Sequence, residues 1–226
     1  MCGRFTLTVE QEMLIDSFDL LTFPDDYMPR YNIAPTQNIL AAVHTDSGRK
    51  AGFLRWGLVP YWVKDTKKWK PLINARVESL TEKASFKHLL NKRRCIIFAD
   101  SFYEWKVDEN GKKIPYRFMK KDEAPFAFAG LWDRKQTTSN NSVVSCTIIT
   151  TQANELVKDV HERMPVMLTE KEAIESWLNT TKYSFRDAKD MLQSFPSNSQ
   201  KCYQVSLAVN NVKNDNLDCI QAVNSL

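Results

Sequence analysis

The segment RCIIFADSFYEW, residues 94–105, has the branched and aromatic side chains of a buried strand region. Further short strand candidates flank it at residues 37–43, 52–60, 114–120, 125–133, 142–151 and 163–168. Helical spacing of apolar residues fits 8–18, with Thr8 as the cap, and also 79–93, 169–179 and 185–195. Because the strands gather in the middle of the chain without regular βαβ alternation, the sequence predicts an α+β fold, with a mostly antiparallel sheet or open β-barrel core and flanking helices.

Length and composition favour one domain over residues 1–226, and no heptad pattern calls for a partner subunit, so we expect a monomer. No apolar run approaches the roughly 18 residues of a membrane-spanning helix and no signal segment opens the chain, which predicts a cytoplasmic protein without membrane contact. The scattered cysteines and histidines favour neither a disulfide framework nor a metal site. Without a glycine-rich phosphate loop or a G-x-S-x-G motif, chemistry is expected from side chains and the N-terminus, with no cofactor.

Positive charge is concentrated in one part of a chain whose net charge is only +4. Residues 64–94 contain ten Lys or Arg against three Asp or Glu, so a polyanion is expected to bind there. Trp62 and Trp69 are interleaved with these cations, a composition typical of surfaces that stack on unpaired bases. The alternative is a solvated lysine loop, and in either case we expect Trp56 to be buried and Trp62 or Trp69 to be exposed.

Cys2 would carry an α-amine and a thiol on neighbouring carbons once Met1 is removed. Such a 1,2-aminothiol forms an imine with an aldehyde, after which the thiolate closes a five-membered thiazolidine ring. Arg4, as a basic neighbour, is expected to lower the pKa of the thiol. From this residue alone, an incidental and inert cysteine is the alternative.

Glu104 lies between two aromatic residues of a strand candidate, so alternation points its side chain away from both. If that face lines a pocket, desolvation would raise the pKa of the carboxyl and suit it to proton transfer; an ordinary exposed glutamate is the alternative. His161 and Arg163 could contact a sugar hydroxyl and a phosphate, or His161 could be a satisfied loop residue. Asn74 and Arg76 would share one face of an extended strand.

Nine segments in order together resemble the SRAP family, the abasic-site processing proteins. They are MCGRF, YNIAPTQ, RWGLVPYW, INARVES, RRCIIFADSFYEW, FAGLWD, CTIITTQAN, HERMPVML and VNNVKNDNLDCI, which run from residue 1 to about residue 220. This resemblance implies an SRAP-like fold and a DNA-damage sensor that binds abasic sites in single-stranded DNA and crosslinks to them. It also implies that the protein removes its own Met1 and reverses the crosslink in some contexts.

The same resemblance implies a role for each candidate residue. Cys2 would be the nucleophile and Glu104 the proton donor and acceptor. Asn74 would hold the N-terminal residue or the sugar, and His161 would bind the opened sugar's hydroxyl. The flanking phosphates would be held by Arg4, Arg76 and Arg163.

Two departures from the family pattern and two rival functions remain. Ser101 stands where the resemblance leads us to expect glycine, which could alter the turn that aims Glu104, and Val212 stands where proline is common. An N-terminal cysteine amidohydrolase would also begin with Met-Cys-Gly, but only that enzyme would release ammonia from glutamine. A non-catalytic module would bind single-stranded DNA by stacking and charge and leave no covalent species.

Overall fold

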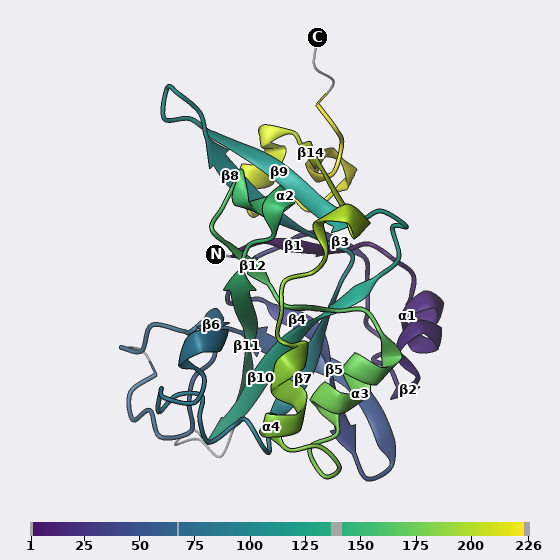
Figure 1. Ribbon diagram of the computed structural model, residues 1–226, viewed down its shortest axis with the longest axis vertical. Helices are drawn as coiled ribbons and strands as arrows, with labels where there is room; N and C mark the ends of the chain where they lie inside the picture. The colour runs from purple at the N-terminus through teal and green to yellow at the C-terminus, as the bar shows by residue number, and fades with distance from the viewer. Residues whose placement is uncertain (1, 67, 137–141, 224–226) are drawn as a thin grey trace.

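The computed structural model describes residues 2–66, 68–136 and 142–223 (Figure 1). Its centre is a ring of five strands, β4 (Asn38–Thr45), β5 (Gly48–Trp56), β7 (Arg94–Ala99), β10 (Phe126–Gln136) and β11 (Ser142–Gln152). The neighbours β5–β4–β7–β10–β11 are antiparallel, and a short parallel pairing of β11 with β5 closes the ring. The predicted α+β fold with a mostly antiparallel, barrel-like core is confirmed.

Four short strands extend the sheet of the barrel. β2 (Leu20–Thr22) pairs with β5, β13 (Met167–Leu168) pairs with β10, and both β6 (Asn74–Arg76) and β12 (Arg163–Pro165) pair with β11. Thr150 of β11 is in register with Arg76 on one side and with Pro165 on the other. The INARVES and HERMPVML segments therefore meet across one end of β11.

A second sheet has the strand order β14 (Gln200–Gln204), β9 (Lys113–Lys120), β8 (Ser101–Val107), β1 (Phe5–Leu7) and β3 (Arg30–Ile33). Only Asp100 separates β7 of the barrel from β8 of this sheet, so the segment 94–105 contains two strands rather than one. Asp100 donates its backbone N–H to the carbonyl of Thr6 over 3.0 Å. The chain thereby passes from the barrel to the second sheet directly beside the N-terminal strand.

The helices are short and lie outside the barrel (Figure 1): α1 (Gln11–Phe18), α2 (Glu155–Lys158), α3 (Lys171–Leu178) and α4 (Phe185–Ala188). The chain also contains short 3₁₀ helices at η1 (Val77–Ser79), η2 (Lys189–Met191), η3 (Ser197–Ser199), η4 (Leu207–Asn210) and η5 (Leu217–Cys219). Helix α3 forms within the predicted range and buries Trp177, whose indole N–H donates to the carbonyl of Cys95 in β7 over 2.9 Å.

Three helix predictions need correction. Thr8 does not cap α1, because its hydroxyl donates to Asp100 over 2.6 Å and Glu10 occupies the cap position. The predicted helix 185–195 is α-helical only as far as Ala188 and then tightens into η2, a geometry in which Leu192 is buried.

The predicted helix 79–93 is wrong, because the chain forms a series of turns after η1 instead. Leu80 and Phe86 are both buried, yet six residues of continuous α-helix would place them about 120° apart around the axis. Turns closed by hydrogen bonds such as Phe86 N–H to Lys83 O, at 2.9 Å, and Leu89 N–H to Phe86 O, at 2.8 Å, bring both side chains to the core.

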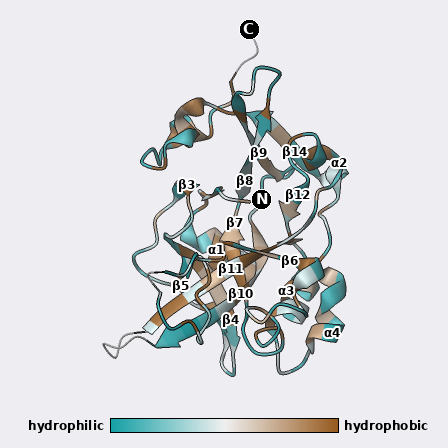
Figure 2. Cartoon of the chain, turned by 90° about the vertical axis from the view of Figure 1, so that its left-hand side faces the viewer, coloured by the Kyte–Doolittle hydropathy of each residue, from teal (hydrophilic) through white to brown (hydrophobic). Residues whose placement is uncertain are grey.

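Buried apolar side chains form one large cluster inside the barrel and beneath the helices, and Figure 2 shows hydrophobic residues along the barrel strands. Phe5 of β1 belongs to this cluster, with its ring centroid 5.2 Å from Trp56 and 5.5 Å from Phe128. A smaller cluster around Tyr103 lies beneath the C-terminal turns. None of the helices in the described part of the chain has the length and apolar character needed to span a membrane.

Candidate active site

Cys2 lies inside the protein, three residues before the Phe5 side chain that anchors β1 to the barrel. Its side chain is wholly buried. Asn74, placed by the pairing of β6 with β11, donates its side-chain N–H to the carbonyl of Cys2 over 2.8 Å. The Asn74 side-chain oxygen is also buried, and none of the described residues donates to it. Asn74 thus holds the backbone of Cys2 and keeps an acceptor available beside it.

The Cys2 thiol is electrostatically unlike an activated thiol. Burial raises its pKa, and the negative charge of Glu104 raises the pKa further, which places these two groups within electrostatic range. The expected net lowering of the thiol pKa is wrong, because burial outweighs the influence of its neighbours. The Arg4 guanidinium donates to Asn32 Oδ1 over 2.7 Å and to the carbonyl of Val209 over 2.8 Å. A base must therefore take the thiol proton before Cys2 can act as a nucleophile.

Glu104 lies on β8, the middle strand of the second sheet. It is almost completely buried, with 4% of its surface exposed. Burial raises the pKa of its carboxyl to about 7. Tyr103 points to the opposite face, into the smaller apolar cluster, as alternation predicts. Trp105 also packs against that cluster, as alternation predicts, and its indole N–H donates to Asn210 Oδ1 over 2.7 Å.

A pocket of about 580 Å³ lies beside Glu104. Its lining consists of Arg4, Glu104, Trp105, Val107, Lys113, His161 and Asn210. Two cationic side chains, an imidazole and a carboxyl that titrates near neutrality give this pocket the means to bind an anion and move protons. No three His, Cys, Asp or Glu side chains within the described ranges are grouped as metal ligands.

His161 brings a neutral hydrogen-bond donor to this pocket. The backbone N–H of Arg163 donates to His161 Nδ1 over 2.9 Å, so the neutral ring carries its proton on Nε2. Burial lowers the pKa of His161 below its ordinary value, which favours that neutral form. His161 is therefore suited to donate to a hydroxyl or carbonyl oxygen.

The sequence matches a known family along most of its length. Residues 1–212 fit the family model described as SOS response associated peptidase (SRAP). The chain belongs to the SRAP family. Among its SRAP relatives, Abasic site processing protein YoaM of Bacillus subtilis is 45% identical, and the alignment covers 100% of both chains. Abasic site processing protein YedK of Escherichia coli is 31% identical over 99% of this chain and 100% of its own.

The fold comparison agrees with this assignment. A crystal structure of a protein from Bacteroides thetaiotaomicron matches the SRAP chain with a TM-score of 0.82, over 98% of this chain and 100% of its own. The two sequences are 23% identical, so this likeness concerns the fold.

Two of the predicted phosphate-binding residues of the SRAP chain lie away from the lining of the Glu104 pocket. Arg163 makes a two-pronged ion pair with Glu78, at 2.7 and 3.0 Å, and donates to the carbonyl of Thr150 over 2.6 Å. The hydrogen bond from Arg163 is the main cause of the lowered pKa of Glu78. Arg76, which is exposed on β6, lowers that pKa further through its charge. Arg76, Glu78 and Arg163 thus form a separate charged group where β6 and β12 meet β11.

The predicted aromatic and basic surface of the SRAP chain forms a pocket of its own, of about 390 Å³. Trp62, Trp69, Lys64 and Lys68 are part of its lining. Trp62 is 42% exposed, and its ring centroid lies 5.3 Å from that of Trp69 with the planes at 85°. Trp56 is fully buried, so the predicted division of these tryptophans between core and surface is confirmed.

Asn32 was not predicted to take part in the site of the SRAP chain, yet it positions Arg4. It is wholly buried, and its side-chain N–H group donates to the carbonyls of Val209, Asn211 and Asn214, at 3.2, 3.1 and 2.6 Å. Its presence in the YNIAPTQ segment was the only signal in the sequence, and that signal does not specify a partner. Asn210 lies in the VNNVKNDNLDCI segment, which likewise specifies no partner, and Lys113 carried no sequence signal that separates it from an ordinary surface residue.

Proposed function

We propose that this protein processes abasic sites in single-stranded DNA by forming a covalent crosslink through Cys2. The observation that carries the proposal is the buried Glu104 carboxyl, with a pKa of about 7, in electrostatic range of Cys2 and beside a pocket with cationic groups. An abasic deoxyribose opens to an aldehyde, the electrophile that an aminothiol captures. The names of the SRAP relatives as abasic site processing proteins support the same substrate.

The reaction begins with hydrolysis of the bond between Met1, which lies outside the described residues, and Cys2. This step consumes one water, releases methionine and leaves a free α-amine on Cys2. Glu104 is the group placed to exchange the protons of the step, because its carboxyl is populated in both protonation states near neutral pH. The peptidase activity of the proposal is therefore autocatalytic.

The crosslink then forms in two steps that together release one water. The amine nitrogen of Cys2 attacks the aldehyde carbon, and protonated Glu104 gives its proton to the departing hydroxyl, which leaves as water and produces an iminium ion. The sulfur next adds to the iminium carbon, and the thiol proton passes to the Glu104 carboxylate, which restores its protonated form. The product is a thiazolidine ring, and the reverse sequence restores the aldehyde.

Positioning of the reactants falls to the neighbouring residues. Asn74 holds Cys2 by its carbonyl, and its buried oxygen is available to accept from the new α-amine. The neutral His161 donates from Nε2 to a hydroxyl of the opened sugar. Arg4, held by Asn32, presents its charge to the phosphate beside the lesion.

The single strand on either side of the lesion would bind two groups outside the Glu104 pocket. Trp62 and Trp69 offer ring faces for unpaired bases next to Lys64 and Lys68. Arg76 and Arg163 contribute positive charge where β6 and β12 meet. We further propose that one monomeric domain in the cytoplasm does this work and shields the lesion on damaged DNA, without a metal or cofactor.

Intact-mass measurement tests the proposal directly. Purified protein is incubated with a single-stranded oligonucleotide that carries one abasic site, and with the same oligonucleotide carrying a tetrahydrofuran site that has no aldehyde. We expect loss of Met1 and a heat-stable species equal to protein plus the abasic DNA less one water, absent with tetrahydrofuran and in Cys2→Ala. Glu104→Gln should form it far more slowly, whereas Glu109→Gln, in the exposed β8–β9 turn, should match the wild type.

The rival functions give different results in the same experiment. An N-terminal cysteine amidohydrolase would lose Met1, form no adduct and release ammonia from glutamine. A non-covalent binding module would retain the abasic oligonucleotide at low salt and release it at high salt, with Cys2→Ala as effective as the wild type. Either result would replace the crosslinking proposal.

A further inference from the structure

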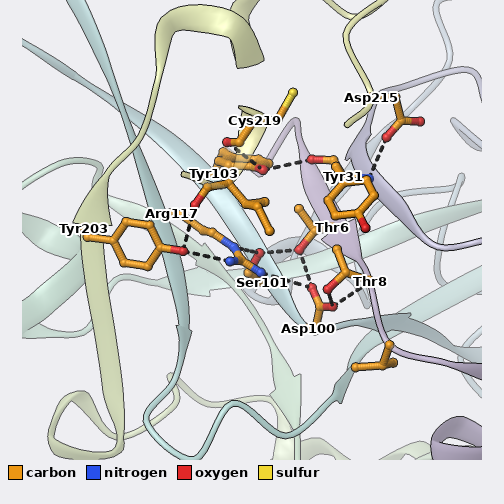
Figure 3. Close-up of polar contacts among 12 residues, drawn as sticks. Thr6, Thr8, Tyr31, Asp100, Ser101, Tyr103, Arg117, Tyr203, Asp215 and Cys219 are labelled. Carbon is orange, nitrogen blue, oxygen red and sulfur yellow. Dashed lines mark hydrogen bonds and ion pairs between the residues drawn. The ribbon is translucent and has the colours of Figure 1, made fainter. Parts of the chain in front are cut away.

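A buried ring of polar groups joins the N-terminal strand to the strand that carries Glu104 (Figure 3). Thr6 of β1 donates its hydroxyl to Asp100 and is hydrogen-bonded to the hydroxyl of Ser101 at the start of β8. Arg117 of β9 donates its Nε–H to Ser101 Oγ over 2.7 Å, and its guanidinium lies 3.8 Å from Asp100. The exposed fractions of these four residues are all 6% or less, so the ring is shielded from water.

The two charged groups of the ring, Arg117 and Asp100, determine the direction of the hydrogen bonds that run between them. A guanidinium has no acceptor and an ionised carboxylate has no donor. Arg117 must therefore donate to Ser101, Ser101 to Thr6, and Thr6 to Asp100. Each hydroxyl uses its single proton in one direction, and the ion pair of Arg117 with Asp100 closes the ring. Removing either hydroxyl leaves a buried partner unsatisfied.

The ring lies at the contact on which the alignment of Cys2 with Glu104 depends. Strand β1 has only three residues, and its register with β8 consists of two pairs, Phe5 with Phe102 and Thr6 with Ser101. Backbone hydrogen bonds flank these pairs, from Tyr103 N–H to Arg4 O at 2.9 Å and from Asp100 N–H to Thr6 O at 3.0 Å. A strand this short has little pairing of its own with which to resist a shift in register.

We propose that Thr6, Ser101 and Arg117 are positioning residues that align Cys2, which precedes β1, with Glu104 on β8. This inference rests on the proposed crosslinking function. Thr6 lies four residues after Cys2, and Ser101 lies three residues before Glu104, so the paired hydroxyls tie together the two short segments that carry the reacting groups. Ser101 is part of an extended strand rather than a turn, which corrects the expectation that it alters a turn.

Thr6→Val and Thr6→Ser form a matched pair of tests. Valine has nearly the shape of threonine but lacks the hydroxyl, while serine keeps the hydroxyl and loses the methyl group. Two quantities are compared: the rate constant of adduct formation with saturating abasic oligonucleotide, and the affinity for the tetrahydrofuran oligonucleotide. We expect Thr6→Val to lower the rate constant roughly 10- to 100-fold, as misplacement of about 1 Å does elsewhere, with affinity within about twofold of wild type. Thr6→Ser should retain most of the rate.

Ser101→Ala provides an independent second break of the ring and replaces Thr6→Val if that variant fails to fold. Ser184→Ala, which removes the cap of α4 on the far side of the barrel, controls for a general loss of stability and should react at the wild-type rate. All rates are measured well below each unfolding transition. The inference is overturned if the hydroxyl-deleted variants react like the wild type, if Thr6→Ser is as slow as Thr6→Val, or if affinity falls as far as the rate. A wild-type protein that forms no adduct would instead refute the crosslinking function, and this inference with it.

Discussion

Burial is the main cause of the raised pKa of the Glu104 carboxyl, and that burial has a cost for stability. Its pKa in the folded protein is about 7, against an ordinary value of 4.5. Between these two pH values the folded state binds more protons than the unfolded state, so this residue makes stability fall as pH rises. Above pH 7 the folded protein holds a desolvated carboxylate.

Glu104→Gln should therefore be more stable than the wild type above pH 7, by roughly 1–3 kcal/mol, although it reacts slowly. Below pH 4.5 the difference should disappear, because the wild-type carboxyl is then protonated in both states. Urea denaturation of the two proteins on either side of this window measures the effect. A wild type that gains stability over Glu104→Gln with rising pH would mean that the carboxylate is stabilised by its surroundings.

At the scale of single residues, the sequence indicated the residue types of the candidate site better than their electrostatics. The pairing of a thiol at residue 2 with a carboxyl in a strand was visible as residue types, and the pKa direction of Glu104 followed once a pocket was assumed. The pKa of Cys2 was predicted in the wrong direction, because burial and the charge of Glu104 raise it, while the Arg4 guanidinium is held by Asn32. Side-chain direction and burial depend on contacts that no local pattern contains.

At the scale of elements, close packing of the barrel strands explains why one glycine is required. A Cβ atom built on Gly130 of β10 would lie 2.8 Å from Ile97 Cδ1, 2.9 Å from Cys95 Sγ and 3.1 Å from the carbonyl oxygen of Thr147. These atoms belong to the two neighbouring strands, β7 and β11, so no single rotamer change relieves the crowding. A side chain at Gly130 therefore requires shifts in both neighbouring strands.

Gly130→Ala should accordingly lower the free energy of unfolding by about 1–3 kcal/mol. Gly52→Ala is the matched control, because the same Cβ atom on β5 meets nothing within 4 Å. Chemical denaturation of both variants gives the comparison. Equal stabilities would show that the barrel absorbs a methyl group at Gly130 without strain.

Strands were predicted more accurately than helices. An apolar strand in a barrel is recognisable from its own residues, so β4, β10 and β11 fall close to their expected ranges. The segment 79–93 has helix-forming residues, yet it forms turns because Leu80 and Phe86 must both reach the core. Tertiary burial overrides local propensity there.

At the scale of the whole molecule, two of the candidate binding groups form pockets that share no residue. One contains Glu104 and His161, and the other contains Trp62 and Trp69. If DNA extends across both, the contribution of the tryptophans depends on the length of the strand. Binding by the lesion pocket alone does not depend on them.

Trp62→Ala should weaken binding of a long single strand with a central abasic analogue by roughly 10-fold, since stacking is worth about 1–3 kcal/mol per base. It should leave unchanged the affinity for the shortest oligonucleotide that still forms the adduct. Fluorescence anisotropy with both lengths tests this, and Leu21→Ala, another exposed apolar side chain on β2, is the control. An equal loss for both lengths would place Trp62 at the lesion pocket itself.

The contacts of Asn32 and Arg4 also bear on when the proposed crosslinking site is completed during synthesis of the chain. Arg4 is held by the carbonyl of Val209, 205 positions later in the chain, and Asn32 is held by carbonyls 177 to 182 positions later. A ribosome makes the N-terminal residues first, so Arg4 is synthesised long before Val209, whose carbonyl accepts its hydrogen bond. The nascent chain therefore carries Cys2 before Arg4 is held in place, and the proposed crosslinking site is complete only after residues 209–214 have folded against Asn32.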